Sequence, residues 1–168
     1  MIIYHGSTVP IEIPKILQSE RMLDFGKGFY TTSNKNQAIS WAQNVAVRRK
    51  TSDQILSIYE FDAETAKKNL SIIYFDEPNE TWLDFVCENR NGRRISQSYD
   101  MVFGPVADDK VYTVVQLYEN GIYDKEDAIK RLKIENLYNQ ILFHTEKSLM
   151  YCRFIKYESF QGERNGQR

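Results

Sequence analysis

The 168-residue chain has few cysteines, few histidines and almost no net charge. Its 2 cysteines, Cys87 and Cys152, have neither the spacing of a metal site nor that of a redox motif. This usage favours a reducing compartment, in which disulfides are rare. The net charge of -1 gives no support for a mainly electrostatic grip on nucleic acid, although a local basic patch is compatible with it.

Long apolar runs are also missing. No segment has the length and apolarity that a membrane span requires, and no charged N-terminal region is followed by an apolar stretch of signal length. We therefore expect a cytoplasmic protein with no membrane partner. No internal repeat or linker marks a second domain, so we predict a single domain over residues 1–160 and a flexible polar tail over residues 161–168.

The sequence does contain two hydrophobic periods, one typical of strands and one typical of helices. They predict an α+β fold with about seven short strands and about four or five helices, without strict alternation. The expected strands cover residues 2–5, 29–32, 54–61, 70–75, 99–105, 139–145 and 153–157. The expected helices cover residues 36–50, 80–89, 107–119 and 125–137, with short helical segments at 16–23, 62–68 and 146–150. Asn34 is the expected N-cap of the first long helix.

One stretch, from Asp24 to Thr32 (DFGKGFYTT), combines a loop and a strand. Its glycines flank a lysine, which is typical of a loop whose backbone passes close to another group, and its aromatic end is typical of a strand. Upstream, His5 ends a short strand and is followed by Gly-Ser. Downstream, Trp41 lies eleven residues after Tyr30 on a predicted helix.

These motifs, His-Gly-Ser, Phe-Gly-Lys-Gly-aromatic-Tyr and an aromatic residue eleven positions later, resemble the NAD-binding core of the ADP-ribosyltransferases, in particular the poly-ADP-ribose polymerase branch. The chain also resembles a bacterial domain family of unknown function in the same superfamily. The motifs cover roughly residues 2–42, and a weaker match near Gln140 extends the resemblance over most of the chain. The resemblance implies a split β-sandwich with flanking helices that holds NAD, as a co-substrate, in the cleft between two small sheets.

The resemblance also implies roles for individual residues. His5 would hydrogen-bond ribose hydroxyls of NAD, and the backbone of Gly6 would hold the carboxamide. Tyr30 would stack on the nicotinamide, and Trp41 would close the other side. Aromatic faces suit this task, because cleavage of the nicotinamide–ribose bond makes a cationic sugar and needs a rigidly held ring. Further pocket members are expected at Ser7 and Lys27.

Two positions depart from the pattern of that family. Where the polymerases have a glutamate at the start of a late strand, this chain has Gln140, whose amide binds a hydroxyl but has neither charge nor basicity. Ala38 stands where they have a serine near the carboxamide. These differences argue against chain elongation and favour a single transfer, with Glu146 as a nearby alternative source of charge. The predicted catalytic residues are His5, Tyr30 and Gln140, and no metal is expected.

Several residues also have purely structural explanations. Trp41 would anchor its helix in the core and His5 would be a satisfied strand histidine, but their positions in the motifs favour the pocket. For residues 8–23, an arch over the nucleotide and an ordinary surface connection are equal alternatives. The arginine-rich segment at residues 89–94 is interpreted as a solvated turn rather than as a contact to phosphate or an acidic partner, and His144 as a packed polar residue.

Three functions are open on this basis. We favour a mono-ADP-ribosyltransferase, an NAD-dependent glycosyltransferase that modifies a protein or nucleic-acid acceptor. The resemblance adds one context for it, a bacterial toxin controlled by a small antitoxin protein. The alternatives are an NAD glycohydrolase, in which water is the acceptor, and a non-catalytic module that binds NAD or an ADP-ribosyl group.

Overall fold

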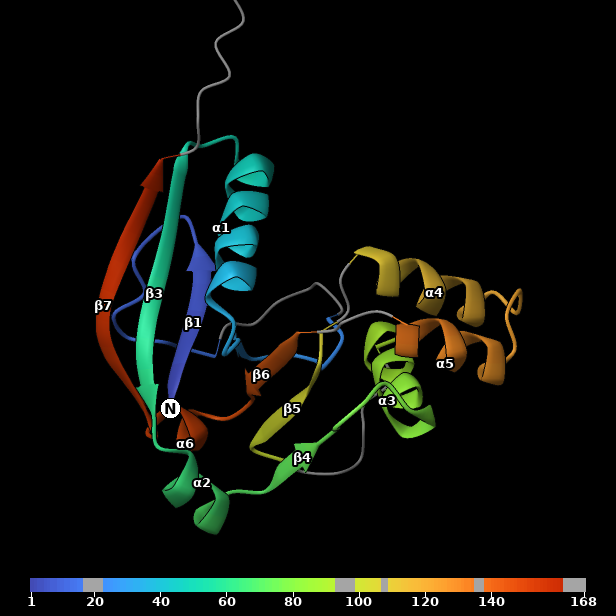
Figure 1. Ribbon diagram of the computed structural model, residues 1–168. Helices are drawn as coiled ribbons and strands as arrows, with labels where there is room; N and C mark the ends of the chain where they lie inside the picture. Colours follow the sequence, from blue (N-terminus) through green and yellow to red (C-terminus); the bar gives the residue numbers. More distant parts are fainter. Residues whose placement is uncertain (17–22, 93–98, 107–108, 135–137, 162–168) are drawn as a thin grey trace, which may run out of the picture.

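The computed structural model describes residues 1–16, 23–92, 99–106, 109–134 and 138–161 (Figure 1). Its strands are β1 (Ile2–Ser7), β2 (Phe29–Thr31), β3 (Asp53–Phe61), β4 (Ile72–Tyr74), β5 (Met101–Pro105), β6 (Asn139–Phe143) and β7 (Cys152–Gln161). Its helices are α1 (Lys35–Arg49), α2 (Ala63–Asn69), α3 (Glu80–Arg90), α4 (Asp109–Glu119), α5 (Lys125–Ile134) and α6 (Glu146–Leu149).

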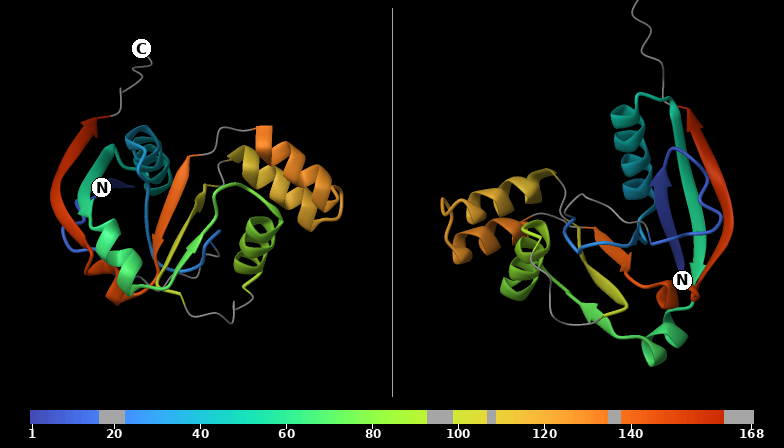
Figure 2. Two further views of the ribbon diagram at one scale, coloured as in Figure 1. Left: turned by 60° about the horizontal axis from the view of Figure 1, so that its bottom comes forward. Right: turned by 180° about the vertical axis from the view of Figure 1, so that it is seen from behind.

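The strands form two sheets. The three-stranded sheet has the order β1-β3-β7 and is antiparallel throughout. The four-stranded sheet has the order β2-β6-β5-β4, and its β4–β5 pair is parallel. Figure 2 shows α1 beside the three-stranded sheet, whereas α3, α4 and α5 form a group beside the four-stranded sheet. The prediction of an α+β fold is confirmed.

The alternation of side chains along β3 supplies two layers of the core. Leu56 and Ile58 pack with Ala38 of α1. Tyr59 and Phe61 belong instead to the cluster between the two sheets. Helix α1 therefore covers one face of the three-stranded sheet, and the four-stranded sheet covers the other.

Strand β6 alternates in the same way and has a core on both faces. Ile141 and Phe143 lie in the cluster between the sheets. Leu142 lies in a different cluster, with Trp82 and Val86 of α3. By the same alternation Gln140, which precedes Ile141, faces the side of Leu142, where α3, α4 and α5 pack. Gln140 and Leu142 therefore share one face of β6.

Among the described residues, the backbones of the two sheets are hydrogen-bonded at one isolated bridge, beyond which β1 and β2 separate. Tyr4 of β1 and Thr32 exchange two backbone hydrogen bonds, of 2.8 and 3.0 Å. Further along β1, residues pair only with β3 on the other side, while β2 pairs with β6. His5 and Tyr30 lie at this point of separation.

Most expected elements occur within a few residues of their predicted bounds, and Asn34 caps α1 by accepting a hydrogen bond from the Gln37 amide. Three expectations about ends are wrong. His5 does not end its strand, because β1 continues through Ser7. Gln161, which we placed in the tail, pairs with Asp53 as the last residue of β7.

The third correction concerns the arginine-rich segment. Arg90 is the last residue of α3, and its side chain is 13% exposed and ion-paired, so it is not part of a solvated turn. Residues 93 and 94, the other two arginines of that segment, lie outside the described residues, as do residues 17–22 and 162–168 of the predicted helical turn and tail. The short segments at 62–68 and 146–150 are the helices α2 and α6, which brings the described helices to six.

Candidate functional site

One cavity brings together most of the residues that the sequence analysis singles out. Its volume is about 910 Å³, and ligand sites in proteins measure roughly 300–1,000 Å³. Helix α1 lines one side, α3 and α4 line the opposite side, and β1, β2 and β6 contribute residues between them. We call the residues His5, Gly6, Tyr30 and Gln140 the strand end of the cavity, and Asp24, Arg90, Tyr112 and Glu119 its helix end.

His5 bridges the strands where the sheets separate. Its Nδ1 atom lies 2.7 Å from the Tyr30 carbonyl oxygen. Because that oxygen only accepts, Nδ1 donates, and the Nε2 atom of the neutral imidazole keeps a lone pair. Burial lowers the pKa of His5, which favours this neutral form at pH 7. The imidazole also contacts the ring of Phe29, with 4.6 Å between centroids.

Tyr30 lines the cavity, and its hydroxyl holds the glycine loop. The hydroxyl donates to the Gly26 carbonyl oxygen at 2.5 Å and accepts from the Phe25 amide at 3.3 Å. Burial raises the pKa of Tyr30 well above its usual value, so the hydroxyl keeps the proton that it donates. Gly26 has a φ of 84°, a conformation that other residues rarely adopt. The ring of Tyr30 is therefore fixed without a ligand.

Gln140 has an unused donor in the wall of the cavity. Its side chain is 6% exposed, and its Nε2 atom has no hydrogen-bond partner among the described residues. A buried amide nitrogen without an acceptor costs about 1–3 kcal/mol. A ligand oxygen placed there would remove this cost. Gln140 is thus the residue of the strand end that most directly indicates a binding site for an acceptor oxygen.

One face of α1 forms the adjoining wall. Trp41 lines the cavity and is half-buried, and it belongs to none of the described core clusters. These observations favour the interpretation of Trp41 as a wall of the pocket over its interpretation as a core anchor of the helix. Gln37, one turn earlier, also lines the cavity, and its Oε1 atom accepts a 2.9 Å hydrogen bond from the Thr32 hydroxyl. We did not single out Gln37. The signal was its spacing from Trp41, because residues four apart share one helix face.

Gly6 allows α1 to lie directly against β1. A Cβ atom on Gly6 would lie 1.9 Å from the carbonyl oxygen of Ala38 and 2.7 Å from the amide nitrogen of Ala42. Both atoms belong to the backbone of α1, so neither can move aside as a side chain would. The glycine therefore has a packing role, beside any role in ligand binding.

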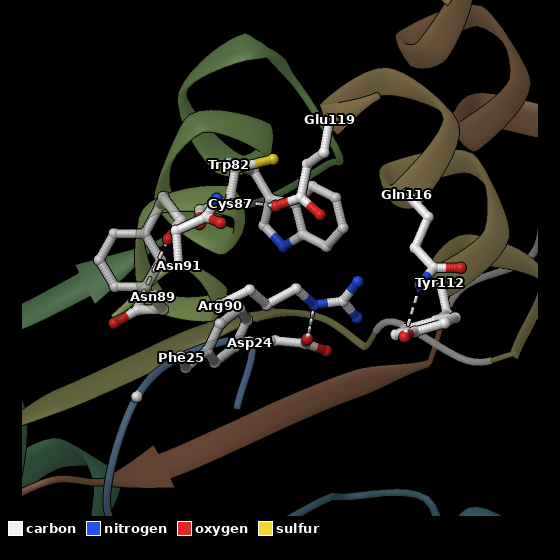
Figure 3. A network of polar contacts seen from close by, with 12 residues as sticks. Asp24, Phe25, Trp82, Cys87, Asn89, Arg90, Asn91, Tyr112, Gln116 and Glu119 are labelled. Atoms are coloured by element: carbon white, nitrogen blue, oxygen red, sulfur yellow. Dashed lines mark hydrogen bonds and ion pairs between the residues drawn. The ribbon is translucent and has the colours of Figure 1, made fainter. Parts of the chain in front are cut away.

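The helix end is built around Arg90 (Figure 3). Its Nε atom donates to Asp24 Oδ1 at 2.6 Å, and its guanidinium lies over the ring of Tyr112, 4.6 Å from the centroid. Its Nη1 atom is buried without a hydrogen-bond partner in the described part of the chain. Burial raises the pKa of the Asp24 carboxyl, and the Arg90 charge opposes that shift. The ion pair with Asp24 therefore engages only the Nε side of the Arg90 guanidinium.

Glu119 completes the helix end from the last residue of α4. Its carboxylate accepts a 3.0 Å hydrogen bond from the Asn91 side chain. It also accepts a hydrogen bond from the thiol of Cys87, whose pKa is raised to about 12, chiefly by burial. Cys87 is therefore a protonated, unreactive thiol at neutral pH.

Several residues that we considered do not line this cavity. Ser7 donates instead to the Val9 carbonyl oxygen at 2.6 Å, and the Lys27 side chain is exposed. Glu146 accepts a hydrogen bond from the Ile16 amide at 3.3 Å, so it does not supply a charge beside Gln140. His144 binds the Lys27 carbonyl oxygen through Nδ1 at 2.6 Å, as the packed polar residue that we expected.

The described residues contain neither a cluster of metal-ligating side chains nor a membrane-spanning helix. No group of three or more histidine, cysteine, aspartate or glutamate side chains is arranged to hold a metal ion within them. No helix in the same part of the chain is long and apolar enough to cross a membrane.

The chain belongs to the protein family described as "Protein of unknown function (DUF3990)", whose family model matches residues 1–154. No curated protein matches the chain. The description of this family states no activity. The likeness to ADP-ribosyltransferases is therefore a prediction that depends on the motifs and on the cavity.

Proposed function

We propose that this member of the DUF3990 family is an NAD-dependent mono-ADP-ribosyltransferase, with an ADP-ribosyltransferase-like split β-sandwich as its fold. One observation supports the proposal most strongly. Of the seven residues that the resemblance places in the NAD pocket, five line the strand end or its α1 wall: His5, Gly6, Tyr30, Trp41 and Gln140. They come from four separate elements, so their meeting in one cavity is not a consequence of sequence proximity.

The nicotinamide would lie against the ring of Tyr30. Because the Tyr30 hydroxyl is held by the glycine loop, the ring loses little freedom when a second ring stacks on it. Trp41 would enclose the nicotinamide from α1, and the backbone of Gly6 would hold its carboxamide. This arrangement would orient the bond that breaks before any charge develops.

The ribose next to the nicotinamide would lie between His5 and Gln140. The neutral His5 ring can accept a hydroxyl proton at Nε2, because Nδ1 is already donating to Tyr30. The Gln140 amide can donate through Nε2 or, after rotation by half a turn, accept through Oε1. Both contacts leave the sugar free to become cationic as nicotinamide departs, without requiring a charged base.

A second candidate, a module that binds NAD or an ADP-ribosyl group without catalysis, is favoured by the charges of the cavity. The described lining residues include two carboxylates, Asp24 and Glu119, and both belong to the helix end. Asp24 is already paired with Arg90. The described residues of the strand end thus include no carboxylate to activate a poor acceptor, and with His5 Nε2 bound to the ribose, transfer would need an acceptor that is nucleophilic by itself.

NAD that carries a label on its adenylate separates these functions, when it is incubated with the protein in a cell lysate. Label on a protein or nucleic acid supports the transferase, and release of free ADP-ribose with nicotinamide supports the glycohydrolase. NAD that binds but stays intact supports the binding module, and absence of both binding and cleavage contradicts the proposal. A small antitoxin partner stays a prediction, which co-purification from the native host would test.

A further inference from the structure

The helix end contains a guanidinium that is fixed in place but only partly used. Its Nε atom is bound to Asp24 at 2.6 Å and one face of it lies on the Tyr112 ring (Figure 3). These two contacts set the plane and direction of the group before any ligand arrives. The buried Nη1 atom has no acceptor among the described residues, although Arg90 lines the cavity.

The unused donor limits which ligand atom can lie beside it. An N–H group of a guanidinium is satisfied by an oxygen that accepts, and the hydrogen bond is about twice as strong when that oxygen carries charge. In the same cavity Gln140 has an unpartnered Nε2 donor. A molecule that satisfies both donors presents acceptor oxygens toward both ends, and of the two donors the charged Arg90 is the better partner for a charged oxygen.

The neighbouring carboxylates decide how strongly such an anion is held. Asp24 neutralises the Nε side of Arg90, and Glu119 adds a negative charge at the same end of the cavity. Glu119 is occupied by the Asn91 side chain and the Cys87 thiol, so it does not take the Nη1 donor. It opposes an incoming anion by repulsion alone, and this repulsion weakens with added salt.

We propose that the helix end is a subsite for the oxyanion of a phosphate group, with Arg90 as its main ligand. Two sources of this group follow from the proposed function, on which this part of the inference rests. Either the pyrophosphate of NAD lies at Arg90, with the nicotinamide at the strand end, or a phosphate of the acceptor lies there beside bound NAD. The chemistry of the subsite is the same in both cases.

Calorimetric titration with inorganic pyrophosphate at low ionic strength tests the subsite without any assumption about NAD. The main variant combines Arg90→Gln with Asp24→Asn, because it removes the guanidinium without leaving a buried carboxylate unpaired and without changing the net charge. We expect it to lose about 10- to 100-fold in affinity for pyrophosphate, in line with the loss of a charge-assisted hydrogen bond. A circular dichroism spectrum and a melting curve like those of the wild type show that the variant is folded.

Glu119→Gln provides the opposite change. It should bind pyrophosphate about two- to fivefold more tightly, because it removes a repelling charge from the helix end. Glu126→Gln makes the same change in net charge on α5, outside the residues that line the cavity, and should bind like the wild type. The inference is overturned if the protein does not bind pyrophosphate, if the Arg90/Asp24 double variant binds it as the wild type does, or if Glu119→Gln and Glu126→Gln behave alike.

A competition titration then assigns the source of the phosphate. Displacement of pyrophosphate by NAD supports the pyrophosphate of the co-substrate, whereas simultaneous binding supports a phosphate of the acceptor. The two proposals also fail separately. Pyrophosphate binding that depends on Arg90 in a protein that neither binds nor cleaves NAD upholds the subsite and contradicts the transferase.

Discussion

The two ends of the cavity are built from different chemistry. At the strand end the polar groups are neutral, with the imidazole of His5 and the amide of Gln140 as the main examples. At the helix end the groups are charged, and Arg90 is paired with Asp24. The difference teaches which part of a ligand each end can hold. The strand end suits a flat ring and sugar hydroxyls, whose binding depends on shape, and the helix end suits an anion, whose binding depends on salt.

The largest loss of stability is expected from a substitution of Gly6. The strand end depends on the close contact between α1 and β1, which Gly6 allows. Gly6→Ala places a methyl group 1.9 Å from the Ala38 carbonyl oxygen, and we expect it to lower the free energy of unfolding by about 3 kcal/mol or more in urea denaturation. Gly121→Ala is the control. Nothing lies within 4 Å of its added methyl, and its φ of 71° should cost only about 1 kcal/mol. Equal losses in both variants would show that the contact is not limiting.

Variants of Gln140 test the strand end more specifically, because its side chain carries the neutral donor that has no partner among the described residues. Gln140→Ala should lower NAD turnover more than NAD affinity, by about 0.5–1.5 kcal/mol for one neutral hydrogen bond and more if the bond tightens in the transition state. Gln140→Glu should retain or increase NAD cleavage, since a carboxylate beside the cationic sugar also helps to activate water. Glu146→Gln, outside the cavity, should have no effect. If both Gln140 variants match the wild type in steady-state turnover, Gln140 is only a strand residue.

A lower pH should reduce the stability of the folded protein through His5. The pKa of His5 is lowered in the folded protein, so the unfolded chain binds the proton more tightly, and stability is lost as the pH falls below about 6.5 through the lowered pKa. The slope of this loss cannot exceed about 1.4 kcal/mol per pH unit for one group. His5→Asn keeps a donor for the Tyr30 carbonyl oxygen but does not titrate. Urea denaturation between pH 7 and about pH 5 should therefore give a flatter pH dependence for His5→Asn, and an unchanged slope would contradict this origin.

A histidine at a strand end would contribute little to stability, and its loss would leave the melting temperature unchanged. His5 lies inside β1, bonds to Tyr30 and contacts Phe29, so His5→Ala should also lower the melting temperature.

The smallest effect is expected from Tyr30→Phe. This change keeps the ring and removes the hydroxyl that holds Gly26, which should cost about 0.5–1.5 kcal/mol of stability and change NAD affinity only slightly. Tyr30→Ala also removes the stacking face and should weaken NAD binding by about 1–3 kcal/mol. Calorimetry on folded protein compares the two. Wild-type affinity in Tyr30→Ala would remove Tyr30 from the site.

Much of the strand end could be predicted because its signals are local. The pattern of Ile2 to His5 indicates a strand, Asn34 is a cap residue before a helical pattern, and the eleven-residue offset between Tyr30 and Trp41 survives in the structure as two walls of one cavity. Each of these depends on residues that are close in the sequence. Local propensity and periodicity suffice for the strand and the cap, whereas the placement of Tyr30 and Trp41 in one pocket was implied by the resemblance of the motifs.

The helix end could not be predicted in this way. Asp24 and Arg90 are 66 positions apart, and no motif connects them. The Asn-Gly pair that follows Arg90 favoured a turn, so we assigned Arg90 to that turn although it is the last residue of α3. A weaker signal was present, because Arg90 continues the spacing of Trp82 and Val86 on the buried face of that helix. An arginine on an apolar helix face needs a partner, and the sequence does not say which carboxylate supplies it.

The central claim, that the strand end binds NAD, is tested most directly by titrating NAD into the wild type, His5→Asn and His144→Asn. The two histidines make the same kind of Nδ1 hydrogen bond to a backbone carbonyl oxygen, at 2.7 and 2.6 Å, but only His5 lines the cavity. The account predicts that NAD binds the wild type and His144→Asn equally and binds His5→Asn at least about tenfold more weakly. Equal binding by all three proteins, or no binding to the wild type, would contradict it.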